Sequence, residues 1–200
     1  MTIICAMRAP ATGRIWAGSD TLITEDDMRY HDCGPKWDFY NGWGIGASGF
    51  LRVVNVVQSS LAELFEPWPD IHAPVTAKVV ADRIRVRVKA DNLAGEMEPT
   101  LPAHATRGGE TESGRDRSPE MLLTDGSGIW IIGSDYSVLA AREFAAVGAG
   151  AKFAYGAYYA IMASQLSFEP LVALRSIIGA ACHYDPYCGG APWVKEIKGG

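Results

Sequence analysis

Apolar residues occur in short runs separated by turn-forming residues over the first fifty positions, a pattern typical of β-strands. Pro10 and Gly13 mark the turn between the first two runs. Asn41-Gly42, a preferred two-residue hairpin turn, separates the next two. Residues 21–35 are polar and lack periodicity, so irregular structure is expected there. The predicted strands are 2–8, 14–19, 36–40 and 43–49.

The next forty residues change to helical spacing. Apolar residues predict one helix over 51–65, ended by Pro67 and Pro69. Residues 74–91 fit two structures, because Val75, Val79 and Val80 have helical spacing whereas 83–89 alternate with a period of two, as a strand does. The basic side of this alternating run is interpreted as a solvated face rather than a nucleic-acid contact.

Residues 92–119 contain hardly any large apolar residue and are rich in Gly, Pro, Glu, Thr, Ser and Arg, which predicts a mobile surface loop. Strands and helices then resume. The predicted elements are a hairpin of 121–124 and 129–132, a strand at 144–147, helices to about 164 and over 169–184, and a strand at 192–197. This order indicates an α+β layered sandwich, with residues 1–200 as one domain.

Composition restricts the class of protein. A chain of 200 residues with 48% hydrophobic content can bury one substantial core. The net charge of −5 and the pI of about 5.4 argue against general nucleic-acid binding. No apolar stretch approaches the roughly 20 residues of a membrane span, and no secretory signal pattern is found at the N-terminus. We therefore expect a soluble, cytoplasmic protein with no membrane partner.

The four cysteines are expected to be free thiols, because a chain this long does not need disulfides and a reducing cytosol disfavours them. Metal-ligating residue types occur in two short segments, 31–33 and 182–188. Their spacing matches no standard zinc pattern, so no metal and no other cofactor is expected.

Thr2 is the strongest chemical candidate. If Met1 is removed, Thr2 carries a hydroxyl nucleophile and a free α-amine on one residue. Such an amine titrates at about 7.7–8.0, so part of it is an unprotonated base near neutral pH. A terminal threonine that uses its own amine as base is a known way to activate a hydroxyl.

Four segments taken in order make the chain resemble the proteasome β-subunit superfamily, N-terminal nucleophile hydrolases, and especially the bacterial HslV-like and proteasome-like peptidases. The resemblance covers nearly the whole chain except 92–119. The segments are Thr2–Met7; Ala17-Gly18-Ser19-Asp20-Thr21; Pro35-Lys36-Trp37 with Gly44–Gly49; and Ala146–Ala151 with Phe153–Gly156 and Asp185–Gly190.

This resemblance implies a four-layer αββα sandwich, a helix at 83–89, and a threonine peptidase that forms an acyl-enzyme. Thr2 would be the nucleophile, Lys36 would favour loss of its proton, and Asp20 would hold Lys36 charged and oriented. A backbone N–H of Ser48 or Gly49 would stabilise the oxyanion, and the two remain alternatives.

The resemblance also implies a role for Asp185 near Thr2. Cys188 stands where a serine is usual, and Ala151 lacks a serine hydroxyl that many relatives carry. Cysteine hydrogen-bonds only weakly, so these departures soften the proton relay. The pocket for the substrate side chain would be lined by Ile23, Asp38 and Gly46, and Gly46 would leave that pocket deep.

Three functions remain open at this stage. The first is a threonine endopeptidase that assembles homo-oligomeric rings, cleaves peptides or unfolded proteins, and works with an ATPase unfoldase. The second is an inactive or latent paralogue that only assembles. The third is a small-molecule amidohydrolase of the same nucleophile type.

Overall fold

The computed structural model describes residues 2–25, 28–31, 33–49, 51–67, 75–91, 119–164 and 168–198. The predicted loop at 92–119 therefore lies, apart from Pro119, outside the described residues. The strands are β1 (Ile4–Arg8), β2 (Ile15–Ser19), β3 (Ile23–Glu25), β4 (Met28–Tyr30), β5 (Trp37–Tyr40), β6 (Trp43–Ser48), β7 (Glu120–Thr124), β8 (Ile129–Ile132), β9 (Val138–Ala141), β10 (Phe144–Val147) and β11 (Trp193–Ile197). The helices are α1 (Leu51–Ser59), α2 (Leu61–Phe65), α3 (Ala77–Ala90), α5 (Ala151–Ala163) and α6 (Pro170–Tyr184).

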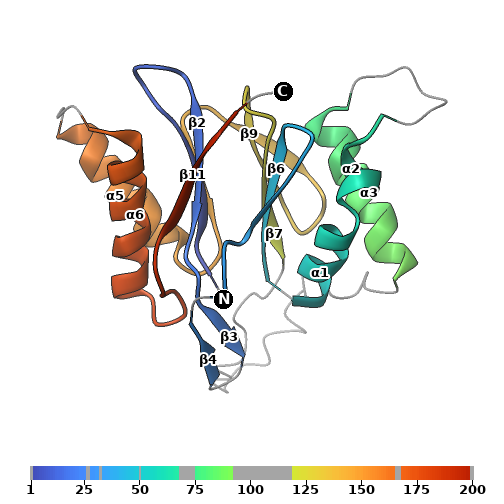
Figure 1. The fold of residues 1–200 in the computed structure, drawn as a ribbon, viewed down its shortest axis with the longest axis horizontal. Helices are drawn as coiled ribbons and strands as arrows, with labels where there is room; N and C mark the ends of the chain where they lie inside the picture. Colours follow the sequence, from blue (N-terminus) through green and yellow to red (C-terminus); the bar gives the residue numbers. More distant parts are fainter. Residues whose placement is uncertain are drawn as a thin grey trace, which may run out of the picture.

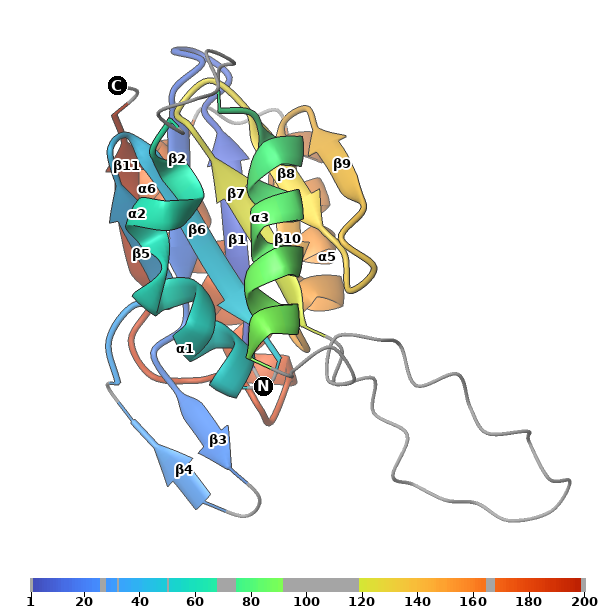
Figure 2. The ribbon, with the colours of Figure 1, turned by 90° about the vertical axis from the view of Figure 1, so that its right-hand side faces the viewer.

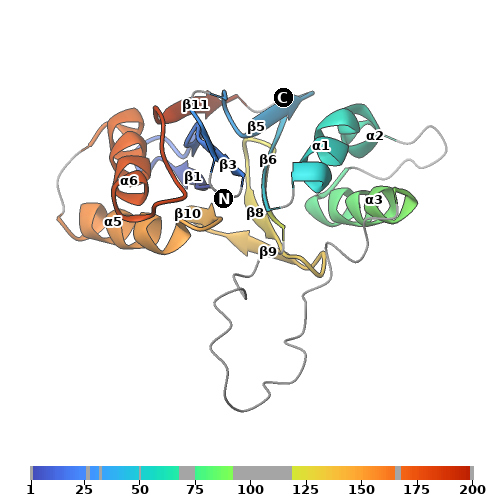
Figure 3. The ribbon, with the colours of Figure 1, turned by 90° about the horizontal axis from the view of Figure 1, so that it is seen from below.

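Two antiparallel sheets form the centre of the molecule. One has four strands in the order β10-β1-β2-β11, and the other has five in the order β5-β6-β7-β8-β9. Seen from below in Figure 3, the two sheets lie between the α5–α6 pair on one side and the α1–α3 group on the other. Figure 1 shows the same succession of layers from left to right. The predicted mixture of helices and sheets in layers is confirmed.

Successive side chains of strand β1 point to opposite faces, and both faces are buried, which explains why the strand is a continuous apolar run. Ile3, Cys5 and Met7 pack in the core beneath α5 and α6, whereas Ile4 and Ala6 pack in the core between the sheets. A third core lies between the five-stranded sheet and the α1–α3 helices. Each of the three layer contacts is thus filled by its own apolar cluster.

The ambiguous segment at 83–89 is helical, as part of α3. Val80, Ile84 and Val88, four residues apart, are buried on one side, while Val86 is exposed. The N-terminus of α3 is capped by Thr76, whose side chain accepts from the N–H of Val79 at 3.3 Å. The period-two strand interpretation is therefore wrong, because alternate apolar residues do not share a face in this segment.

Three further differences come from contacts that the chain pattern does not contain. The single helix expected over 51–65 is interrupted at buried Ser60, whose Oγ accepts from Arg87 Nε at 3.0 Å. The irregular stretch at 21–35 contains the short hairpin β3–β4, which extends beyond the body of the two sheets (Figure 2). Strand β9 was not anticipated, and it pairs with β8 at the edge of its sheet.

The antiparallel order brings many strand ends to one end of the molecule. Ile4 is paired with Ser19 and with Val147, which places the start of β1 beside the end of β2 and the end of β10. In the second sheet, Ser48 at the end of β6 is paired with Glu120 at the start of β7. Residues that are far apart in the sequence therefore meet where β1 begins.

Gly46 tests how tightly the two sheets pack. A Cβ at this position would lie 2.6 Å from Ile4 Cγ2 and 3.0 Å from Trp37 Cε2. We expect Gly46→Ala to lower the free energy of unfolding by about 1–3 kcal/mol in urea titrations, because the core must shift to admit the methyl group. As a control, Gly156→Ala in α5 meets no atom within 4 Å and should raise stability by about 0.5–1 kcal/mol. A Gly46→Ala protein whose free energy of unfolding equals that of the parent protein would contradict this packing.

Candidate active site

Thr2 lies immediately before β1 and is 5% exposed. Its hydroxyl donates to Asp20 Oδ1 and accepts from the ammonium of Lys36. Its carbonyl accepts from the N–H of Gly150 at 3.3 Å. The structure thus brings together the three residues that the sequence assigned to nucleophilic chemistry.

Asp20 follows β2 and is fully buried. Its Oδ1 accepts from the Ile3 N–H at 3.1 Å, and its Oδ2 accepts from the Gly189 N–H at 3.1 Å. Lys36 Nζ lies 2.6 Å from Oδ1. These donors satisfy a carboxylate that has no access to water, so Asp20 is held in one position.

Lys36 precedes β5, and its side chain is 13% exposed. Its ammonium contacts the hydroxyl of Thr2, the carboxylate of Asp20, and the carbonyl of Leu22 at 2.5 Å. Burial lowers the pKa of Lys36 from its usual value, and the charge of Asp20 opposes that shift. Three acceptors match the three N–H groups of the charged form, so the geometry favours an ammonium.

Two glycines support Thr2 from the turn between β10 and α5. Gly148 has φ +92°, and a Cβ there would lie 2.4 Å from the carbonyl oxygen of Thr2. Gly150 approaches the same oxygen through its N–H. Sequence reasoning placed these residues in a family segment but gave them no role in the site. Their requirement for close backbone approach is visible only in the folded chain.

Asp185 and Cys188 lie in the turn after α6, at the same end. Asp185 is buried, its Oδ1 accepts from the Tyr187 N–H at 2.8 Å, and its carbonyl accepts from the Cys188 N–H at 3.1 Å. The thiol of Cys188 lies 2.8 Å from the position that a Cβ on Gly150 would occupy. Burial, followed by the charges of Asp20 and Asp185, raises the pKa of Cys188, so the thiol is neutral.

Ser48 and Gly49 also lie at this end, where β6 stops. The Ser48 hydroxyl donates to the carbonyl of Glu120 at 3.1 Å. Gly49 has φ +109°, and a Cβ there would meet the backbone of Pro119 at 2.6 Å. A side chain is excluded at Gly49 on both grounds. The choice between the two N–H groups as oxyanion donors stays a prediction.

The three residues expected to line a substrate pocket have different surroundings. Ile23 is partly buried at the start of β3. Asp38 accepts from Gln58 Nε2 at 2.7 Å. The expectation that Gly46 leaves a deep pocket stays a prediction, and the side chains of Ile4 and Trp37 lie where a Cβ on Gly46 would point.

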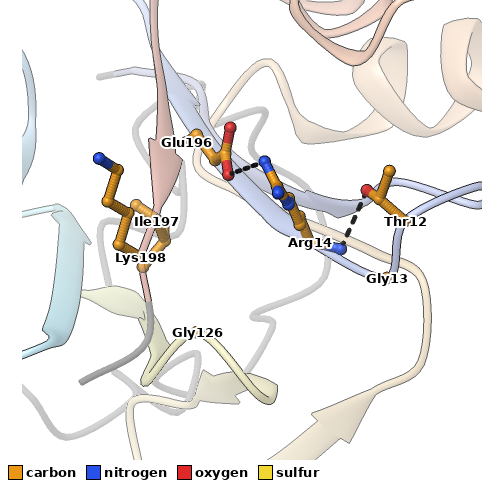
Figure 4. Close-up of a pocket in the computed structure, with 7 residues that line it drawn as sticks. All are labelled: Thr12, Gly13, Arg14, Gly126, Glu196, Ile197 and Lys198. Atoms are coloured by element: carbon orange, nitrogen blue, oxygen red, sulfur yellow. Dashed lines mark hydrogen bonds and ion pairs between the residues drawn. The ribbon is translucent and has the colours of Figure 1, made fainter.

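A cavity of about 520 Å³ lies at the other end of the molecule, beside the β1–β2 turn. Figure 4 shows Arg14 and Glu196 facing each other there, joined by an ion pair of 3.0 Å. None of the expected site residues lines this cavity. The candidate site is therefore defined by its polar contacts and not by this hollow.

Metal ligation and membrane insertion were both considered from the sequence. Within the described residues, no three His, Cys, Asp or Glu side chains are grouped so that they could hold a metal ion. Among the helices of the same residues, none is both long and apolar enough to cross a membrane.

Comparison with solved structures identifies the fold. BPH from Thiobacillus denitrificans, solved in complex with epoxomicin, is 20% identical, with 98% of this chain and 100% of that chain covered and a TM-score of 0.64. HslV from Trypanosoma brucei is 13% identical, with 98% of each chain covered and a TM-score of 0.69. The Anbu complex from Pseudomonas aeruginosa, described as a helical assembly, is 15% identical, with 98% of this chain and 80% of that chain covered and a TM-score of 0.65.

Neither protein-family models nor curated proteins give a match to the sequence. The structural likeness nevertheless extends over nearly the whole chain. The chain has the fold of HslV-like and other proteasome-like subunits, and the resemblance seen in the sequence is confirmed at the level of fold.

The buried pair can be tested by removing one partner. Lys36→Met should lower the free energy of unfolding by about 3–5 kcal/mol, because it leaves the buried carboxylate of Asp20 without its cation. The double variant Asp20→Asn/Lys36→Met should recover part of this loss in urea titrations. Purely additive losses would show that the two charges are not coupled.

Proposed function

We propose that this chain is a threonine-type peptidase subunit in which Thr2 becomes the N-terminal nucleophile after removal of Met1. The observation that carries the proposal is the placement of the Thr2 hydroxyl between the carboxylate of Asp20 and the ammonium of Lys36. A structural aspartate and a surface lysine would not be expected to converge on a buried threonine hydroxyl.

The reaction follows from this geometry. Thr2 Oγ1 attacks the carbonyl carbon of a peptide bond, and its proton passes to the freed α-amine acting as base. The proton is then given to the departing amine as the C–N bond breaks, which leaves an ester on Thr2. Water, deprotonated by the same amine, attacks the ester and releases the new carboxyl end. Lys36 favours the oxyanion character of Oγ1 throughout, and Asp20 keeps Lys36 charged.

The tetrahedral intermediate requires a donor aimed at its oxygen. We assign this role to the backbone N–H of Ser48 or Gly49, because their turn lies at the end of the molecule where Thr2 is held. Cys188 packs against Gly150 in the turn that contacts Thr2, and Asp185 holds the turn that carries Cys188. The neutral thiol of Cys188 packs against Gly150 and does not take part as a charged group.

The wider proposal concerns the assembly. We take the layered structure to be the four-layer αββα sandwich of N-terminal nucleophile hydrolases, formed by one domain of this chain. The sequence resemblance suggests a homo-oligomeric ring, and the structural likeness to the Anbu complex, described as a helical assembly, supports an assembly of several copies. The resemblance further suggests peptides or unfolded proteins as substrates, and an ATPase unfoldase as partner.

An assembly-forming paralogue without catalysis is the second candidate. It is favoured by Ala151 and Cys188, which both lack the hydroxyl expected from the resemblance. The two candidates share a fold and differ in whether Thr2 reacts.

Intact mass spectrometry with epoxomicin separates them. The purified protein should have lost Met1 and should gain the mass of one inhibitor per chain, because the inhibitor's epoxyketone needs a free α-amine beside a nucleophilic hydroxyl. Thr2→Ala should gain none, whereas Thr2→Ser should retain labelling at a lower rate. A protein that has lost Met1 and still forms no adduct would contradict the peptidase proposal.

The pH dependence of kcat/KM provides an independent check. Activity should rise through the pKa of the terminal amine, ordinarily about 7.7–8.0, because the base must be unprotonated. It should fall again at a pH below the free-lysine value of 10.5, because burial lowers the pKa of Lys36 and the ammonium is needed. Stopped assays with a fluorogenic peptide would give both limbs. An alkaline limb absent up to pH 10.5 would argue against a required Lys36 charge.

A further inference from the structure

Glu120 connects the two halves of the candidate site. It begins β7, where its carbonyl accepts from the Ser48 hydroxyl at 3.1 Å and the preceding Pro119 packs on Gly49. Its carboxylate Oε2 accepts from the N–H of Gly148 at 3.4 Å, and Gly148 lies in the turn after β10 of the four-stranded sheet. Gly148 in turn packs against the carbonyl of Thr2. One glycine residue therefore separates this carboxylate from the backbone of Thr2.

The charge of Glu120 is exposed and uncompensated by the surrounding described residues. Lys36, the cation of the site, is buried and bound to Asp20, Thr2 and Leu22. Across the described ranges, Glu120 makes no ion pair. Asp38, the acid that the sequence placed in a substrate pocket, is instead bound by Gln58. Within the described part of the chain, the Glu120 carboxylate beside Thr2 thus has a backbone hydrogen bond but no cation.

We propose that Glu120 selects substrates with a positively charged side chain, lysine or arginine, within two residues of the bond that is cleaved. This inference rests on the proposed peptidase function. In the proposed reaction, the substrate carbonyl lies at Thr2 Oγ1 and within reach of the 48–49 turn. Glu120 is hydrogen-bonded to Ser48 in that turn and to Gly148, which packs against Thr2. A neighbouring substrate side chain is therefore brought close to the carboxylate.

The expected effect is moderate because the carboxylate is exposed. Ion pairs in solvent contribute up to about 1 kcal/mol, which corresponds to about 5-fold in kcat/KM. Salt screens such pairs, since the Debye length falls from about 10 Å at 0.1 M to about 3 Å at 1 M. A preference caused by Glu120 should therefore decline with ionic strength, unlike one caused by the shape of a pocket.

The test uses four pairs of fluorogenic peptides. Each pair differs only in lysine or norleucine at one of the two residues on either side of the bond. Norleucine has the length of lysine without its ammonium. In at least one pair, the lysine peptide should be cleaved with about 5-fold higher kcat/KM at low salt, and the ratio should approach 1 at 1 M NaCl. Glu120→Gln should abolish the ratio while keeping an oxygen acceptor for the Gly148 N–H.

Two further variants separate charge selection from support of the fold. Glu196→Gln makes the same change at the far end of the molecule and should leave the ratio as in the parent protein (Figure 4). Glu120→Ala should lose the ratio as well. If Glu120→Gln keeps the lysine preference and only Glu120→Ala slows both peptides equally, the residue positions Gly148 and the proposal is overturned.

The remaining outcomes distinguish this inference from the function on which it rests. Labelling of Thr2 by epoxomicin, together with equal cleavage of both peptides in all four pairs, would overturn the role of Glu120 and leave the peptidase standing. Absence of both labelling and cleavage would overturn the peptidase proposal and the role of Glu120 together.

Discussion

The buried contact between Asp20 and Lys36 is the interaction on which the candidate site depends. Two charges withdrawn from water are costly unless each finds its partner and the remaining hydrogen bonds are satisfied. Here the carboxylate also accepts from Ile3 and Gly189, and the ammonium also donates to Leu22. The pair is thus held by backbone from the residue before β1, from the residue before β3, and from the turn after α6. Thr2 is fixed in the same network.

This network explains why the site lies where the strands end. In the middle of either sheet, backbone N–H groups are used in the ladders and are not free for a carboxylate. At the end where β1 begins, Ile3 and Gly189 still have N–H groups to donate. The antiparallel order gathers such ends from both sheets, so the chemistry and the rim that carries Glu120 lie close together. The turn after α6 adds the helix layer to the same arrangement.

Much of this arrangement was predictable from the sequence. Asn41-Gly42 predicted the hairpin turn between β5 and β6, and the apolar run after Thr2 predicted the strand β1. The order of short segments around Thr2, Asp20 and Lys36 pointed through a family resemblance to three residues that the structure brings together. The same resemblance favoured a helix at 83–89, where the bare periodicity of the residues favoured a strand. Local pattern and turn chemistry were sufficient for the β5–β6 hairpin and for β1 because the structure there is decided by near neighbours.

The rest was decided by contacts between distant segments. Gly46 was expected to leave a deep substrate pocket, and only the packing between the sheets shows that Ile4 and Trp37 lie where its Cβ would point. Glu120 carried no sequence signal, and only the pairing of β6 with β7 and the approach of Gly148 bring it to the rim. The sequence by itself determined which residues could react and most, though not all, of the segments that form strands and helices. Only the tertiary structure decided which of them meet, because burial, close backbone approach and the pairing of charges depend on residues that the chain holds far apart.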